Sequence, residues 1–326
     1  MEQIIPPVSA DTAWEIESFL LKIFEYGDYS FRSMLRGEYA LTLGSCCFAA
    51  LHQEKIVGVV VCLYPRQNPL AALLGPVAVA KDIRRNKIAS LLIRRAIDHL
   101  LERGCLAAYL GVSYDNPARK LYRRCGFEDY HGIVMRRLFC PVREFDDRCY
   151  NQKSDLKVGC VNWGDFCGVQ ALLASPCSMY CFDFSAGLFS SKYDQPHLFL
   201  PVFPRIMRNI AAQKAAARVL RAGPDQNPVG IAHLLKSETP LQQHRAVLDF
   251  FMHDNFLDNA KILLQQTLQE RPFPRVHKIN VFIPAGDGLK RRALEDISAR
   301  LVAVLPRELL LEKRYMDVCV YEIDLQ

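Results

Sequence analysis

The chain has 326 residues, of which half are apolar and 23% are charged, so it can bury two ordinary domains and is not globally disordered. Its formal net charge of +6 is local, because residues 81–124 hold eleven basic and four acidic side chains, a net of +7, and the rest of the chain sums to −1. No apolar run approaches the roughly 18 residues of a membrane span and no leader pattern opens the chain, so we expect a cytoplasmic protein without membrane contact.

The first 65 residues predict two helices and a hairpin. Apolar side chains recur at helical spacing after Thr12, and the pair Thr12 and Glu15 fits a capping box. Two apolar runs then follow each other closely, as in a β-hairpin. The predicted elements are a strand at Met1–Ile5, a helix after Thr12, a helix at Ser30–Leu41, and strands at Cys46–His52 and Lys55–Tyr64 that turn at Gln53-Glu54.

The next stretch organises the chain. It predicts a buried strand, a basic loop, a helix that ends before Gly104, a second strand and a shorter helix. These are Leu73–Ala80, Lys81–Lys87, a helix with its apolar stripe from Ala89 to Leu100, Leu106–Val112 and Asp115–Cys125. The first amides of a helix lack partners within it and the helix dipole is positive there, so a basic loop leading into a helix favours phosphate binding. The alternative is a solvated basic face.

Two motifs in this stretch resemble the GNAT superfamily of acyl-CoA-dependent N-acyltransferases. The family's Q/R-x-x-G-x-G/A loop aligns with Arg84–Ala89, in which Lys87 replaces a glycine. The family's N-x-x-A-x-x-L-Y-x-x-x-G-F pattern aligns with Asn116–Phe127. One further strand, Gly132–Phe139, completes the order of elements. The resemblance covers residues 1–140 and implies an α/β (α+β) fold, a mixed twisted sheet flanked by helices, whose central parallel strands splay apart.

The resemblance implies acetyl-CoA as co-substrate and no metal cofactor. Backbone groups of two residues of the first parallel strand would pair with the pantetheine arm, and Asn116 would also bind the arm. The Arg84 side chain and four backbone amides would hold the pyrophosphate. The implied contacts are Val77 and Val79 for the arm, and Arg84, Arg85, Lys87, Ile88 and Ala89 for the pyrophosphate.

The resemblance also implies that an amine attacks the thioester directly and that Tyr122 protonates the departing thiolate. A phenol with an ordinary pKa near 10 holds its proton at neutral pH, which suits this role. The structural alternative is an aromatic side chain that packs its helix on the sheet. The general base stays unassigned; its candidates are Glu25, Asp28, Glu38 and His52.

The acceptor is expected to be a small-molecule amine or the N-terminal or lysine amine of a peptide. In the family, the first two helices choose it. Here this region combines aromatic rings with carboxylates, which suits a cationic amine through ring and charge contacts. The residues concerned are Phe24, Glu25, Tyr26, Asp28, Tyr29 and Phe31. The alternative is core aromatics with solvated acids.

The twelve cysteines show no C-x2-C pairs, so the sequence predicts buried thiols and no metal site. In a reducing compartment, disulfides are not expected either.

Residues 141–155 are polar and predict a linker, followed by a second domain at 156–326. Its end faintly repeats the first domain, because Asp287–Leu294 parallels Asp115–Tyr122 at an offset of 172. The supporting elements are strands at Arg245–His253, Lys278–Pro284 and Val318–Leu325 and a helix at Asn255–Gln269. No basic loop joins strand to helix there, so this half resembles a degenerate GNAT domain; the alternative is an unrelated substrate or partner domain.

Three functions remain open. The first is an acetyl-CoA-dependent N-acetyltransferase, and the second is a non-catalytic protein that binds CoA or a partner. The third is a nucleic-acid binder, against which the basic stretch lacks interleaved stacking aromatics and any recognition motif. The oligomeric state is not predicted.

Overall fold

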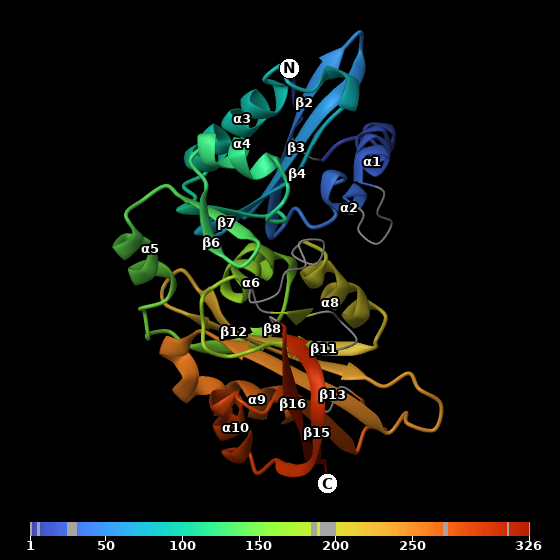
Figure 1. Cartoon of the computed structure of the whole chain (residues 1–326), viewed down its shortest axis with the longest axis vertical. Coiled ribbons are helices and arrows are strands. Elements are labelled where there is room, and N and C mark those ends of the chain that lie inside the picture. The colour runs from blue at the N-terminus through green and yellow to red at the C-terminus, as the bar shows by residue number, and fades with distance from the viewer. Residues whose placement is uncertain are drawn as a thin grey trace. The chain divides into compact units, whose positions relative to one another are not determined.

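The computed structural model describes residues 2–4, 7–24, 31–183, 188–189, 200–269, 273–311 and 313–325. The chain forms two compact units. The first consists mainly of residues 1–148 and includes 162–171, and the second consists mainly of residues 202–326 and includes 149–161. Each unit is built on its own seven-stranded mixed sheet (Figure 1). The prediction of an α+β fold with two mixed sheets is confirmed.

The first sheet contains one parallel pair of neighbours, β4 and β5, and all its other neighbours are antiparallel. The strands lie in the spatial order β1 (Glu2–Ile4), β2 (Leu43–His52), β3 (Lys55–Pro65), β4 (Ala71–Val79), β5 (Ala107–Gly111), β7 (Val134–Leu138) and β6 (Glu128–His131).

Helices cover both faces of this sheet (Figure 1). Side chains alternate between the faces of a strand, so Cys46, Phe48 and Ala50 of β2 all face one side. That side buries Leu92, Ile93 and the other apolar residues of α3 (Ile88–Glu102), together with Tyr122 of α4 (Ala118–Arg124). Helix α1 (Ala10–Phe24) packs on β3 and β4.

Two helical predictions near the N-terminus are corrected. Helix α1 begins at Ala10, and the hydroxyl of Ser9 accepts a hydrogen bond from the Thr12 amide at 3.1 Å, so Ser9 and not Thr12 is the cap. The predicted helix at Ser30–Leu41 is reduced to α2 (Arg32–Leu35). Turns follow α2, and Gly37 with a φ of 73° interrupts the helical pattern.

Two turns in the first unit adopt the predicted shapes, and a third turn follows α4. Gln53 and Glu54 both have positive φ and join β2 to β3 directly. Gly104 follows α3 in the left-handed conformation, with a φ of 76°. Gly126 does the same after α4, and its amide bonds back to the Arg123 carbonyl at 3.0 Å. These turns set where α3 and α4 begin and end.

The predicted linker at 141–155 is not wholly irregular, because it contains helix α5 (Val142–Cys149). Further along the chain come η2 (Trp163–Asp165) and α6 (Phe166–Leu173). Within the first unit, the ring of Trp163 stacks on Tyr39 with centroids 3.8 Å apart. Helix α5 is partly exposed, with Phe145 and Cys149 buried, which agrees with the polar composition of residues 141–155.

The second sheet repeats the strand arrangement of the first. Here too a single parallel pair, β13 and β14, lies among antiparallel neighbours. The order is β8 (Lys157–Cys160), β11 (Ala215–Ala222), β12 (Asn227–Lys236), β13 (Arg245–Met252), β14 (Lys278–Pro284), β16 (Arg314–Asp324) and β15 (Arg300–Leu311). A separate ribbon joins β9 (Phe182–Asp183) and β10 (Leu188–Phe189).

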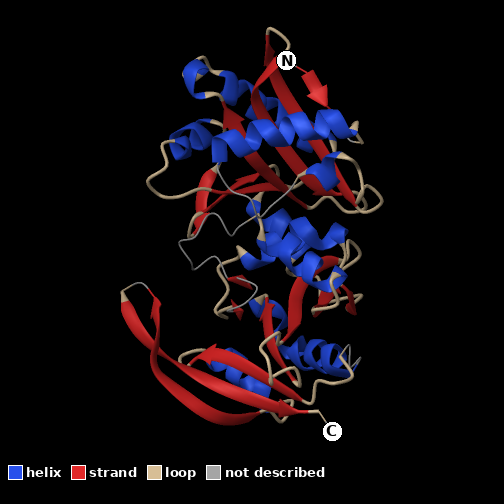
Figure 2. Cartoon of the chain, turned by 90° about the vertical axis from the view of Figure 1, so that its right-hand side faces the viewer, coloured by secondary structure: helices blue, strands red, loops and turns tan. Residues whose placement is uncertain are grey.

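The helices of the second unit also follow the order of the first. A 3-10 segment, η3 (Asp254–Asn259), and α9 (Ala260–Gln269) connect the two parallel strands. Helix α10 (Gly288–Glu295) follows β14, and α8 (Val202–Ala211) precedes β11. The final hairpin differs, since β15 and β16 form a long curved ribbon (Figure 2) while β6 and β7 are short. In the described part of the chain, every helix is too short or too polar to span a membrane.

Candidate functional site

The first sheet opens between its two parallel strands. β4 and β5 pair only from Ala71 opposite Ala107 to Leu73 opposite Tyr109, although β4 continues to Val79. The other edge of β4 keeps pairing with β3 as far as Val79. The edge of β4 that faces away from β3 therefore leaves backbone groups that an extended ligand can pair with like an added strand. Val77 and Val79, the predicted contacts for the arm, lie in this stretch.

A bulge in β4 coincides with the point of separation. The ladder between β3 and β4 shifts between Val60 and Cys62, opposite Gly75 and Pro76. Gly75 has a φ of 140°, which favours glycine, and Pro76 has no amide hydrogen to donate. Bulges bend a strand, so this pair turns the end of β4 away from β5. The Gly-Pro pair is the sequence signal for the bulge, although the apolar run around it predicts an uninterrupted strand.

Helix α3 begins beside the end of β4 without a side-chain cap. Its N-cap residue is Lys87, with a φ of 62° and a ψ of 4°, and the Lys87 side chain makes no capping hydrogen bond. Lys87 therefore adopts the left-handed conformation that glycine adopts most readily. Arg85 in the same loop also has positive φ, at 72°. Amides at the start of a helix favour an anion, so this end of α3 is a candidate anion site.

The basic residues of the loop face solvent. Lys81, Arg84, Arg85 and Lys87 are exposed, and among the described residues none of them forms an ion pair. The Arg84 Nε donates a hydrogen bond to the carbonyl oxygen of Val79 at 3.2 Å. The Val79 carbonyl oxygen, which is predicted to bind the pantetheine arm, thus already has a partner in this structure. That partner is Arg84, which is predicted to bind the pyrophosphate.

The other predicted ligand of the arm, Asn116, lies at the start of α4. Its Oδ1 accepts from the Ala118 amide at 2.9 Å, which caps the helix. Asn116 is exposed, and it follows the end of β5 on the side of the opening. The residue therefore has both the structural role of a cap and a position that is compatible with binding.

Part of the basic character of α4 serves the fold. Arg119 is buried, donates to the Val112 carbonyl oxygen at 2.8 Å and pairs with Asp129, and Arg123 pairs with the same carboxylate. The guanidinium groups of Arg123 and Arg119 hold the pKa of Asp129 below its usual range. These contacts fix α4 to the end of β5 and to β6. From the sequence alone, both arginines add to the positive charge that favours phosphate binding. Their spacing does not indicate that Asp129 neutralises them.

Tyr122 is buried, with 8% of its surface exposed. It belongs to the core cluster that includes Leu74 of β4 and Leu110 of β5, the first residues beyond the last paired positions. Its ring packs edge-on against Phe127 with centroids 6.1 Å apart. The structure thus gives Tyr122 a packing role, and it also places the residue in the cluster that lines the separating strands.

The candidates for base and acceptor contacts are dispersed. Glu38 is exposed and lies 3.7 Å from Arg36, and His52 is exposed at the end of the β2–β3 hairpin. Phe31 is buried at 4% exposure, so it is a core residue rather than a contact for a cation. Glu25, Tyr26, Asp28 and Tyr29 lie outside the described residues. No general base is assigned.

The second sheet opens in the same way but is filled by the chain itself. β13 and β14 pair only from Arg245 to Val247, and β9 lies beside both strands. Residues 178–181, which precede β9, are bonded to three carboxylates. The Ser178 amide and hydroxyl donate to Asp254 at 3.0–3.3 Å, the Tyr180 amide donates to Asp287 at 2.8 Å, and the Cys181 thiol lies 3.2 Å from Asp249 Oδ2.

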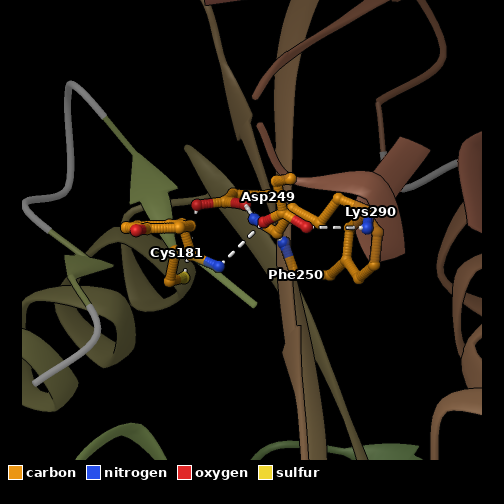
Figure 3. Close-up of polar contacts among 6 residues, drawn as sticks. Cys181, Asp249, Phe250 and Lys290 are labelled. Carbon is orange, nitrogen blue, oxygen red and sulfur yellow. Dashed lines mark hydrogen bonds and ion pairs between the residues drawn. The ribbon is translucent and has the colours of Figure 1, made fainter. Parts of the chain in front are cut away.

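A buried ion pair closes this second opening (Figure 3). Asp249 of β13 pairs with Lys290 of α10, and both side chains are fully buried. Asp249 Oδ1 also accepts from the Phe250 amide at 2.8 Å, and the Lys290 ammonium lies 5.0 Å from the Phe250 ring centre. Burial alone would lower the pKa of Lys290, but the Asp249 carboxylate holds that pKa above its ordinary value.

The two openings have opposite charge. Residues 81–87 carry four basic and one acidic side chain, while residues 253–259 carry two acidic and no basic ones apart from His253. Asp254 and Asp287 stand at the starts of η3 and α10. These helix starts already hold carboxylates of the chain, so a polyanion has no favourable place there.

Comparison with known proteins finds a family resemblance. Residues 12–127 match the acetyltransferase (GNAT) family, and this range contains the opening, the basic loop and both motifs. Over these residues the chain is similar to GNAT acetyltransferases.

The chain is also similar to individual proteins. The N-alpha-acetyltransferase MAK3 of Arabidopsis thaliana is 36% identical over 83 residues, which is 25% of this chain and 44% of that protein. The chain therefore spans less than half the length of this relative. Among solved structures, an N-acetyltransferase from Staphylococcus aureus Mu50 is 13% identical, covering 53% of this chain and all of that one, with a TM-score of 0.43. The protein yncA of Salmonella typhimurium, solved with its cofactor acetyl-CoA, is 12% identical over 52% of this chain and 94% of its own, with a TM-score of 0.42.

The second unit is GNAT-like in its strand order. It repeats the single parallel pair, the helix between the two parallel strands and the helix that follows them. Side-chain caps start both following helices, Asn116 for α4 and Asp287 for α10, although at an offset of 172 residues the two caps are one position out of register. The second unit therefore has a GNAT-like fold whose opening is occupied by its own chain.

Proposed function

We propose that the GNAT domain is an N-acetyltransferase that moves the acetyl group of acetyl-CoA to an amine in a ternary complex. The observation that carries the proposal is the combination, in one opening, of an unpaired stretch of β4 with an uncapped helix start. The first suits the amide-bearing arm of the co-substrate, and the second suits its pyrophosphate. In the second unit, the chain's own residues occupy both the opening between the strands and the helix starts.

The residues would act as follows. Backbone groups of Val77 and Val79, with Asn116, would hold the arm, while the amides of Arg85, Lys87, Ile88 and Ala89 and the Arg84 side chain would bind the pyrophosphate. The acceptor nitrogen would attack the thioester carbon, the carbon–sulfur bond would break, and Tyr122 would give its proton to the thiolate. Because no covalent enzyme intermediate is needed, most of the acceleration would come from positioning the two reactants.

The contact between Arg84 and Val79 suggests an exchange of partners on binding. In the structure Arg84 Nε donates to the Val79 carbonyl oxygen. When the arm pairs with β4, this guanidinium is released from Val79 and can turn to the phosphates, where a charge-assisted bond is stronger than the bond to a neutral carbonyl that it replaces. The Val79 end of β4 would thus have a hydrogen-bond partner in both states, first Arg84 and then the arm.

The test is release of free thiol from acetyl-CoA by the full-length chain with a panel of amines. The panel contains polyamines, free amino acids, peptides with free N-termini and peptides with internal lysine. Turnover that depends on one amine class supports the proposal and names the acceptor. Binding of acetyl-CoA without turnover on any amine would contradict it in favour of a non-catalytic CoA-binding protein.

A further inference from the structure

Three side chains that the proposed function does not use bring potential metal-ligating atoms together in the core of the first unit. They are Cys46, Cys62 and His99, and one ligand atom of each lies within 4.8 Å of those of the other two. The two cysteines are fully buried and His99 is 4% exposed. The three residues come from β2, β3 and α3, so they are too far apart in the sequence to form a short motif.

The fold dictates that these residues meet. Cys46 and Cys62 are directly opposite each other in the β2–β3 ladder, and both face α3. His99 lies in the last turn of α3, on the face that packs against the sheet. The rings of Phe48 and Tyr64 flank its imidazole, with centroids 6.0 and 5.6 Å away. Apolar packing therefore fixes the orientation of the imidazole beside the two thiols.

We propose that Cys46, Cys62 and His99 form a binding site for a thiophilic divalent ion of the Zn²⁺ type. Two sulfur ligands and one imidazole are the donors that such an ion prefers, and no carboxylate is among them to attract a harder ion. Two thiolates balance the charge of a divalent ion, so the bound site is neutral and compatible with an apolar core.

The geometry needs only a small adjustment. In a tetrahedral zinc site with zinc–sulfur bonds of about 2.3 Å, two sulfur atoms lie about 3.8 Å apart. Ligand atoms within 4.8 Å of one another reach this spacing by rotation of the side chains.

A bound ion would join the last turn of α3 to β2 and β3. The opposite end of α3 is the uncapped start at Lys87. The ion would therefore anchor the helix that presents the proposed phosphate site. An ion that binds only the folded chain raises its melting temperature, and the rise grows with its affinity and concentration.

The experiment is titration of the reduced, chelator-treated full-length chain with Co²⁺ and then Zn²⁺. We expect one equivalent of Co²⁺ to produce the intense visible bands of a tetrahedral site and a near-ultraviolet charge-transfer band from thiolate ligands, and we expect Zn²⁺ to abolish both. Cys46→Ser and His99→Phe should lose these bands. Cys47→Ser is the matched control, because Cys47 is equally buried on the same strand but faces the other side of the sheet.

X-ray absorption of the zinc-loaded wild-type chain keeps the test independent of how the variants fold. A first shell with at least two sulfur atoms and one nitrogen supports the site. No uptake of either ion by the fully reduced chain would overturn the proposal. Uptake that survives Cys46→Ser but is lost in Cys47→Ser would overturn it as well.

Discussion

The two openings of this molecule show how one fold can present a site or close it. In each unit a parallel pair of strands separates after three paired positions, and a helix begins near the end of the first strand. In the first unit that helix starts uncapped behind a basic loop, and the strand edge is free of the neighbouring strand. In the second, the residues before β9 and the pair Asp249–Lys290 occupy the same place. Similarity of fold therefore does not carry the function, and the side chains at the opening decide it.

The largest expected effect comes from breaking the buried pair in the second opening. Asp249→Ala leaves the Lys290 ammonium buried without a partner, so we expect it to lower the free energy of unfolding by about 3–5 kcal/mol. Denaturant titration measures the loss. Asp258→Ala, on an exposed side chain of η3, is the control and should change stability by about 0.5 kcal/mol or less.

A double variant tests whether the pair stabilises or only fills this opening. Asp249→Leu with Lys290→Met removes both charges, and we expect stability close to that of the wild-type chain. A double variant that is as unstable as Asp249→Ala would show instead that the charge pair itself is strongly stabilising. Because the pKa of Lys290 is raised in the folded state, the stabilisation is complete below the ordinary lysine pKa and is lost as the pH rises through the raised value.

In the first opening, Tyr122→Phe removes the proposed proton donor and keeps the ring that packs on Phe127. General acid catalysis contributes about 10²-fold or more, so we expect turnover to fall by about that factor with little change in acetyl-CoA affinity. Turnover is measured by thiol release and affinity by calorimetry. Unchanged turnover between pH 6 and 9, about the range in which a phenol keeps its proton, would leave Tyr122 with a packing role only.

Arg84→Ala is expected to weaken acetyl-CoA binding by about tenfold, as the loss of one charge-assisted hydrogen bond predicts. A truncated pantetheine thioester without the pyrophosphate should bind equally well to both proteins. Arg95→Ala, an exposed arginine in the middle of α3, is the control and should leave both affinities unchanged. Equal weakening of the two ligands by Arg84→Ala would place this residue on the arm rather than on the phosphates.

The smallest effect concerns the residue that departs from the family motif. Lys87 has positive φ, which costs a residue with a side chain about 1 kcal/mol relative to glycine, so Lys87→Gly should stabilise the chain by about that amount. Acetyl-CoA binding should persist. Asn86→Gly, at a position without positive φ, should give no gain in thermal melting. A loss of stability in Lys87→Gly would show that the lysine side chain supports the loop.

The elements with strong local signals are predictable from the sequence. Leu73–Ala80 and Leu106–Val112 are recognisable as strands because their apolar runs are short and bounded, and Gly104 marks the end of α3. The offset of 172 residues locates the repeat in the second half. These features depend on residues that are close in the sequence, or on a repeat within it, so one sequence is enough to predict them.

Features that depend on contacts distant in sequence could not be predicted. The closure of the second opening joins residues 178–181 to Asp249, Asp254 and Asp287, about 70 to 110 positions away. The neutralisation of Arg119 requires Asp129 to arrive on the next strand. Helix boundaries are a second feature that could not be predicted, as the short α2 and the Ser9 cap of α1 show. They depend on local turns, which the spacing of apolar residues does not reveal.

The central claim is that one opening is available to acetyl-CoA and the other is not. Calorimetric titration of the full-length chain with acetyl-CoA tests it most directly. We expect micromolar binding with one site per chain, and we expect Arg84→Ala to weaken this single site. Two sites per chain would contradict the closure of the second opening, and no binding would show that the uncapped start of α3 does not hold the pyrophosphate.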